Sequence, residues 1–140
     1  MLILALALLV TPPGCAGHEL TNQRQDVASV RRVDSAWSAA YIRGDTAFFR
    51  CLLTPDYKGY NVAAVESGRD DEVGKAARYG RPDRPLVPYP NPSIEMHGSS
   101  AIVNGVTSTK RWIDVYRFED GGWHAFFSVD LKIPAASPAS

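Results

Sequence analysis

The 140-residue sequence has no excess of charge of either sign, because 15 Lys and Arg residues balance 15 Asp and Glu residues. Nucleic-acid partners select basic surfaces, so this balance argues against nucleic-acid binding. The three histidines are scattered without HxH or HExxH spacing, which argues against a metal site. A glycine-rich phosphate loop and a nucleophile elbow are also missing. We therefore expect neither a metal ion nor another cofactor.

Long hydrophobic runs are absent except at the start, MLILALALLV. Residues 2–10 are too short to cross a bilayer as a helix and are typical of the apolar part of a signal peptide. Cys15 follows Gly14 as the lipid-accepting cysteine does in bacterial lipoproteins, although Pro12 replaces the branched aliphatic residue of that motif. Ordinary cleavage after Ala16 is the alternative. No Lys or Arg precedes the run, so the true start could lie upstream.

These features predict an exported protein, in the periplasm, secreted or lipid-anchored, with residues 1–17 as its signal. The membrane would then be a partner only through a lipid on Cys15, and a cytoplasmic location follows if the run is not a functional signal. Cysteine is scarce, and the two residues present allow one disulfide, Cys15–Cys51, only if Cys15 survives processing. The apolar neighbours of Cys51 favour a small buried hydrophobic residue instead.

Helices are expected in the first half of the chain. Residues 22–43 form a long amphipathic pattern that Gly44 ends, with Asn22 and Gln25 as a capping pair. Asp45 then caps a second helix that stops before Pro55. Residues 56–62 are typical of a short strand or bend, and residues 69–80 predict a weaker third helix with acids at its start.

Strands are expected in the second half. The segment RPDRPLVPYPNP, residues 81–92, has five prolines and predicts a loop or a ragged edge. After it, period-two alternation predicts four strands, with a hairpin turn at Asp120–Gly121. The order predicts an α+β fold: three N-terminal helices on a strongly curved antiparallel or mixed sheet, with a cone-shaped hollow between them. We expect one domain over residues 18–132 and a disordered tail over 133–140.

The segments VDSAWSAAYIRGDTAFFRCLLTPDY, HGSSAIVNG and IDVYRFEDGGWHAFFS carry a resemblance to a known superfamily. Over residues 22–132, the chain resembles SnoaL-like and ketosteroid-isomerase-like domains of the nuclear-transport-factor-two-like (NTF2-like) superfamily. The resemblance implies a curved sheet with three helices, a cone-shaped pocket and a homodimer. Members include isomerases, cyclases, dehydratases, hydrolases and domains without chemistry, so the fold does not determine the function.

The strand WIDVYRF holds the main catalytic candidate. Alternation places Trp112, Asp114, Tyr116 and Phe118 on one face, which the row of rings marks as the inner one. Burial among rings would raise the pKa of Asp114 and make it a workable general base, with tyrosine hydroxyls as proton donors. The isomerases that the chain resembles use an aspartate base in such a pocket, although no shared motif aligns theirs with Asp114. A structural role, in a pair with an arginine or as an acceptor of hydrogen bonds, is the more common outcome for such an acid.

The remaining candidates are aromatic. Trp37, Tyr41, Tyr57 and Tyr60 would line the hollow from the helix side, with simple core packing as an equal alternative. The predicted ligand-binding set is therefore Trp37, Tyr41, Tyr57, Tyr60, Trp112 and Phe118, and the predicted catalytic set is Asp114, Tyr41 and Tyr116. Asp34 could reach the pocket mouth, but an ion pair with an arginine on the helix surface is the more common outcome.

Together these patterns predict a pocket for a small apolar or amphipathic molecule. If the domain is an enzyme, cofactor-free proton transfer or dehydration fits best. The alternative is a structural or interaction module that dimerises through the outer face of the sheet and has a filled interior.

Overall fold

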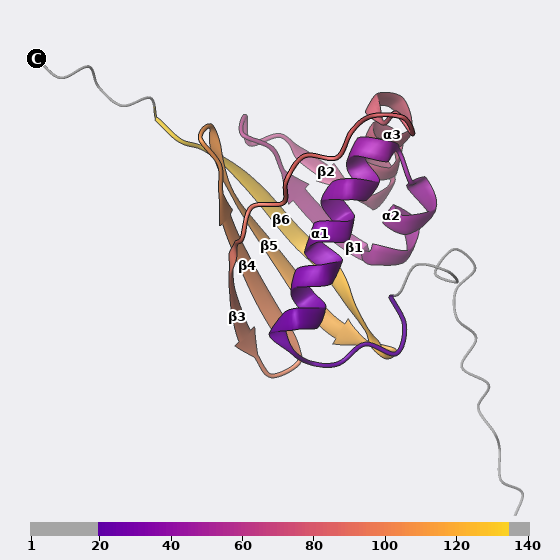
Figure 1. Ribbon diagram of the computed structural model, residues 1–140, viewed down its shortest axis with the longest axis vertical. Helices are drawn as coiled ribbons and strands as arrows, with labels where there is room; N and C mark the ends of the chain where they lie inside the picture. The colour runs from indigo at the N-terminus through magenta and orange to yellow at the C-terminus, as the bar shows by residue number, and fades with distance from the viewer. Residues whose placement is uncertain (1–19, 135–140) are drawn as a thin grey trace, which may run out of the picture.

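The computed structural model describes residues 20–134 and places three helices on one face of a six-stranded sheet (Figure 1). The helices are α1 (Val27–Arg43), α2 (Thr46–Leu52) and α3 (Arg69–Tyr79). The strands are β1 (Leu53–Tyr60), β2 (Glu66–Gly68), β3 (Ser93–His97), β4 (Ser100–Val106), β5 (Lys110–Glu119) and β6 (Gly122–Lys132). The expected α+β fold with three helices is confirmed.

The sheet is mixed and not closed, with the strand order β2-β1-β6-β5-β4-β3. Strands β3 to β6 form the expected antiparallel meander, and β1 joins it in parallel beside β6. The turn between β5 and β6 is the expected tight hairpin: Asp120 and Gly121 have φ angles of 50° and 77°. The short strand β2 was not predicted, because three residues are too few to show a period.

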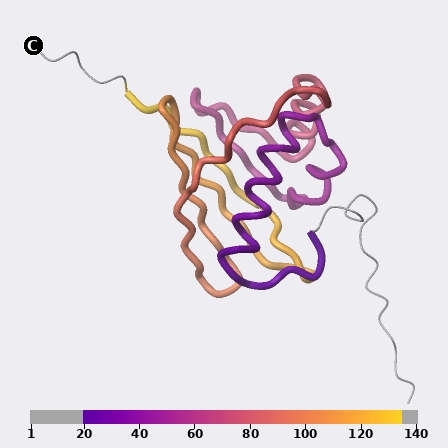
Figure 2. The backbone as a smooth tube through the Cα atoms, in the orientation of Figure 1, coloured from indigo at the N-terminus to yellow at the C-terminus, as the bar shows by residue number. Residues whose placement is uncertain are grey.

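Helix α1 begins later than expected. Its cap is Asp26, whose side chain accepts a 2.8 Å hydrogen bond from the Ser29 backbone N–H. Asn22, the expected cap, has a φ of 57° and lies outside the helix. The preceding segment instead runs to the β5–β6 turn (Figure 2), where the Gln23 N–H donates to the Gly121 carbonyl at 2.8 Å. Tertiary hydrogen bonds therefore replaced the local helical ones.

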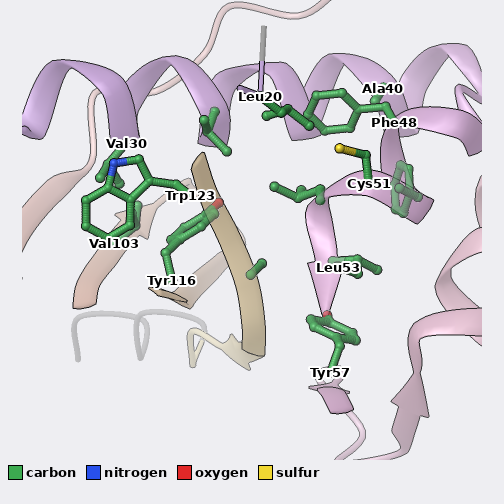
Figure 3. Packing of buried hydrophobic residues seen from close by; sticks show 14 of the residues in the cluster. Leu20, Val30, Ala40, Phe48, Cys51, Leu53, Tyr57, Val103, Tyr116 and Trp123 are labelled. Carbon is green, nitrogen blue, oxygen red and sulfur yellow. The ribbon is translucent and has the colours of Figure 1, made fainter. Parts of the chain in front are cut away.

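The core lies between α1, α2 and the inner face of the sheet. The largest fully buried side chains are Trp123, Tyr116 and Phe49. Figure 3 shows the core residues in two groups under α1: Val30, Val103, Tyr116 and Trp123 at one end, and Ala40, Phe48, Cys51 and Leu53 at the other. The expected burial of Cys51 is confirmed.

Several expectations concern residues outside the described range. They are the signal over residues 1–17, the lipid on Cys15, its disulfide with Cys51, and the tail from residue 135 onward. Among residues 20–134, no helix combines the length and the apolar character needed to cross a membrane.

Candidate functional site

A cavity of about 760 Å³ lies between α1, α3, the segment over residues 81–92 and the inner face of strands β1, β5 and β6. Six aromatic residues line it: Trp37, Tyr41, Tyr57, Tyr60, Tyr89 and Trp112. The Tyr60 ring itself packs on Phe127, with the centroids 6.0 Å apart, and its hydroxyl donates to Glu66. Six ionisable acids and bases also line it: Asp34, Glu72, Lys75, Lys110, Asp114 and Asp130. The inward-facing rings of α1 therefore help to wall a pocket.

Asp114 lies on strand β5 and lines this cavity. Because side chains alternate along a strand, Asp114 faces inward together with Trp112 and Tyr116, as expected. Its side chain is only 7% exposed. The sheet register sets Asp114 opposite Ser128 of β6, and the two side chains are hydrogen-bonded. No arginine lines the cavity among the described residues, so an arginine pair is not observed there. The other structural role, as an acceptor of hydrogen bonds, stays an alternative.

Asp34 meets Asp114 from the helix side. Both Asp34 oxygens accept phenol hydrogen bonds: Tyr116 Oη donates to Oδ1 at 2.6 Å, and Tyr89 Oη donates to Oδ2. A further hydrogen bond links the Asp34 carboxyl to Asp114. The expectation of a surface ion pair for Asp34 is wrong, since the side chain is 4% exposed. Helical spacing aligns residue 34 with buried Val30, on the face that packs on the sheet.

The two carboxyl groups form a coupled pair. Burial raises the pKa of Asp114 well above its usual range, and the negative charge of Asp34 raises it further. The hydrogen bond from Ser128 opposes this shift by stabilising the ionised form. The balance keeps a proton on Asp114 at a pH at which an exposed aspartate is ionised.

The tyrosines of the site remain hydrogen-bond donors. Burial raises the pKa of Tyr57, Tyr89 and Tyr116 above the usual range for a phenol. The nearby carboxylates add to each shift: Glu72 for Tyr57, and Asp34 for Tyr89 and Tyr116. A phenol that keeps its proton can donate to a carboxylate or to a ligand oxygen.

Two ion pairs also line the cavity. Lys75 Nζ lies 2.6 Å from Glu72 Oε1 on α3, and Ser67 Oγ donates to the same oxygen at 2.5 Å. Lys110 Nζ lies 2.8 Å from Asp130 Oδ2 across β5 and β6. Within residues 20–134, no group of three or more His, Cys, Asp or Glu side chains is arranged to hold a metal ion.

The structure places most of the expected ligand-binding side chains together. Five of the six line the cavity: Trp37, Tyr41, Tyr57, Tyr60 and Trp112. Phe118 does not, because it packs edge to face on Trp123, with the ring centroids 5.2 Å apart. Tyr116 was expected as a catalytic donor. It is fully buried and its hydroxyl donates a hydrogen bond to Asp34, which positions that carboxylate.

Sequence reasoning missed Tyr89. The segment over residues 81–92 was expected to be a loop, and it connects α3 to β3 alongside α1 (Figure 1). Tyr89 reaches Asp34 from this segment, while Arg31 of α1 donates to Asn91 and to the Pro92 carbonyl, the latter at 3.2 Å. The sequence signal that could have indicated Tyr89 is its place between two prolines, because proline restricts the backbone of this segment.

A second, smaller cavity of about 320 Å³ lies at the other side of α1. Its lining includes Leu20, Arg32, Arg43 and Asp45. Asp45 is the cap of α2 and accepts a hydrogen bond from the Phe48 N–H at 3.0 Å. Since the described lining offers no second carboxyl group near Asp45, the larger cavity is the candidate site.

The sequence matches no family model and no curated protein. Solved structures do match. An NTF2-like protein of unknown function from Silicibacter pomeroyi is similar over 76% of this chain and 95% of its own, with 14% identity and a TM-score of 0.65. An NTF2-like protein from Cytophaga hutchinsonii is similar over 74% and 95%, with 14% identity and a TM-score of 0.63.

A third structure, a candidate dehydratase of the NTF2-like family from Streptomyces avermitilis, is similar over 79% of this chain and 97% of its own. Its identity is 16% and its TM-score 0.63. These likenesses confirm the expected NTF2-like fold. At such low identity they carry over no activity, so any function has to be argued from the cavity itself.

Proposed function

We propose that this domain, whose fold is that of the NTF2-like superfamily, binds a small amphipathic molecule in its cavity and transfers a proton on it through the Asp34–Asp114 pair. One observation carries the proposal: two buried carboxyl groups, linked by a hydrogen bond, line a cavity of about 760 Å³. A ring-lined hollow with a few convergent polar groups is the usual form of a small-molecule site.

The pair supplies an acid and a base without a cofactor. Asp34, whose oxygens already accept two phenol hydrogen bonds, fits the ionised form, because an ionised carboxylate only accepts. Asp114 carries the proton at rest. In a dehydration, Asp34 takes a proton from a ligand carbon, and Asp114 gives its proton to the departing hydroxyl, which leaves as water. A proton passed from Asp34 to Asp114 then restores the starting state.

The expected role of Asp114 as the base is therefore revised in this proposal. Its raised pKa suits it to donate first, with the neighbouring carboxylate as the base.

Exchange of carbon-bound hydrogen tests the chemistry. The neutral ketone 2-tetralone is incubated in D₂O with the protein, and loss of its α-proton signal is followed by NMR. We expect exchange faster than in buffer, reduced by about 100-fold or more in Asp34→Asn or Asp114→Asn, because general acid–base catalysis contributes on that scale. Glu95→Gln, an exposed site on β3, is the matched control and should keep the activity. Equal rates in all variants would remove the catalytic part.

A second candidate function rests on the other face of the sheet. Half-buried apolar side chains lie there, on the face that no described helix covers (Figure 1): Ile102, Ile113, Val115, Phe127 and Val129. At the edge of this face, Arg117 pairs with Asp56 and Glu119, so the rim carries both signs of charge. Such a surface suits a second copy of the same chain, in a homodimer.

The solution mass tests the homodimer. Light scattering after size exclusion should give twice the chain mass for the wild type, and the chain mass for Val115→Asp, which buries a charge in the sheet-to-sheet contact. A wild-type monomer at the highest soluble concentration would contradict the homodimer.

A further inference from the structure

We infer that the cavity selects an organic cation: a protonated amine or a quaternary ammonium group carried on an aromatic or aliphatic body. This inference rests on the proposed binding function and names its ligand class. The cavity combines six aromatic residues with four carboxyl groups and two ammonium groups among its described lining residues.

The charges of the wall do not cancel. Each lysine is already matched by its own carboxylate, Lys75 by Glu72 at 2.6 Å and Lys110 by Asp130 at 2.8 Å. The remaining carboxyl pair, Asp34 and Asp114, has no ammonium or guanidinium partner among the described lining residues, so its negative charge is not offset. That charge lies in the most buried part of the wall, where screening by water and salt is weakest.

The rings suit the same ligand. A cation is attracted to the face of an aromatic ring, most strongly Trp, and the attraction grows when water is excluded. Trp37 and Trp112 approach the cavity from opposite sides, one from α1 and one from β5. The apolar body of an amphipathic cation would pack on these rings while its ammonium group approaches the carboxyl pair.

Three buried tyrosines lie close to the carboxylates of the cavity. The pKa of Tyr57, Tyr89 and Tyr116 is raised by burial and, in each case, by at least one carboxylate of the cavity. These hydroxyls lie on three separate elements, β1, the 81–92 segment and β5. An anionic ligand would meet the charge of the carboxyl pair with no uncommitted ammonium group among the described lining residues.

The test uses three probes of matched size: 1-naphthylmethylammonium, 1-naphthylmethanol and 1-naphthoate. Their dissociation constants are measured by calorimetry at neutral pH and low salt. We expect the ammonium to bind about tenfold or more tightly than the alcohol, and the carboxylate to bind weakest.

The variants change the charge of the Asp34–Asp114 pair. Asp114→Asn leaves the carboxylate of Asp34 in place, so it should keep most of the preference. The double variant Asp34→Asn/Asp114→Asn removes the charge and should bring the ammonium and the alcohol to equal affinity. Glu95→Gln removes one charge outside the cavity and should change nothing. Should the double variant fail to fold, Glu72→Gln leaves Lys75 unpaired and should weaken the ammonium and strengthen the carboxylate.

The outcomes separate this inference from the proposed function. Three probes that bind equally well would overturn the cation preference and leave a binding cavity. The tightest binding by naphthoate would overturn it as well. No binding of any probe would overturn both the preference and the proposed binding function.

Discussion

Asp114 keeps its carboxyl group where ionisation is unfavourable, between rings and beside a second carboxylate. A neutral amide of the same shape could donate to Asp34 and accept from Ser128, and it would need no proton. Asp114 therefore makes the folded protein less stable than an asparagine at this position would. Such a cost at a cavity wall is typical of a group that serves chemistry or binding.

Asp114→Asn should raise the free energy of unfolding at neutral pH. The pKa of Asp114 is higher in the folded state than the value of about 3.9 in an unfolded chain. The folded state therefore binds more protons in this window, and stability falls as pH rises from about 4 to the raised pKa, by about 1.4 kcal/mol per pKa unit. Urea denaturation at pH 4 and pH 7.5 measures it. A stabilisation by Asn that appears only at the higher pH agrees with this account, and an equal loss at both pH values contradicts it.

Tyr116→Phe should lower the free energy of unfolding by about 1.5–3 kcal/mol, the usual range for a hydrogen bond to a charged group. The substitution removes the 2.6 Å bond to Asp34 in a fully buried place. Tyr89→Phe removes the other phenol bond at a half-buried place and should cost less. The exposed Tyr79→Phe on α3 serves as the control. If Tyr116→Phe costs no more than this control, the bond does not stabilise the site.

The two carboxyl groups differ in how far the sequence could predict them. Period-two alternation, together with the row of rings on one face of the strand, predicted that Asp114 faces inward with Trp112. Nothing local marks Asp34 as buried, since its phenol partners, Tyr89 and Tyr116, lie 55 and 82 residues further along the chain. An acid on an apolar helix stripe looks the same in sequence whether it faces an arginine or two tyrosines.

At the scale of elements, the pairing of β4 with β5 shapes the cavity. Gly105 lies opposite Trp112, and a Cβ at Gly105 would lie 1.9 Å from Trp112 Cζ2. The indole ring therefore lies directly over the glycine backbone. This contact fixes where one of the cavity rings lies, so Gly105 is a positioning residue for the ligand site.

Gly105→Ala should weaken ligand binding by displacing the Trp112 ring. We expect an affinity loss of about tenfold for 1-naphthylmethylammonium, and a changed tryptophan fluorescence spectrum in the unliganded protein. Gly74→Ala is the matched control, because nothing lies within 4 Å of an added Cβ in that helix. It should keep the affinity and raise the stability by about 0.5–1 kcal/mol. Unchanged binding by Gly105→Ala would show that the ring position does not matter.

Elements with a strong internal period were the ones the sequence predicted. Strands β3 to β6 and helices α2 and α3 appear within a few residues of the expected ranges. The start of α1 was misplaced because Gln23 bonds to the distant β5–β6 turn, a contact without a local signal. The segment over residues 81–92 was correctly expected to lack regular structure, and its contacts with Arg31 and Asp34 depend on tertiary packing.

At the scale of the whole molecule, the helices cover one face of the sheet (Figures 1 and 2). A cavity of about 760 Å³ lies beside α1. The resemblance to NTF2-like domains predicted this architecture. The volume of the hollow could not be read from the sequence, because it is the small remainder between the space enclosed by the elements and the side chains that fill it. The proposed function depends on this cavity and on the carboxyl pair that lines it.

The titration of Asp114 tests this account most directly. The protein is labelled with ¹³C at the aspartate carboxyl carbons, and the Asp114 signal is assigned by its loss in Asp114→Asn. We predict a titration midpoint well above that of an exposed aspartate such as Asp56, and Asp34→Asn should remove the part of this upward shift that the Asp34 charge causes. A midpoint near 4 that is unaffected by Asp34→Asn would contradict the coupled pair, and with it the proposed chemistry of the cavity.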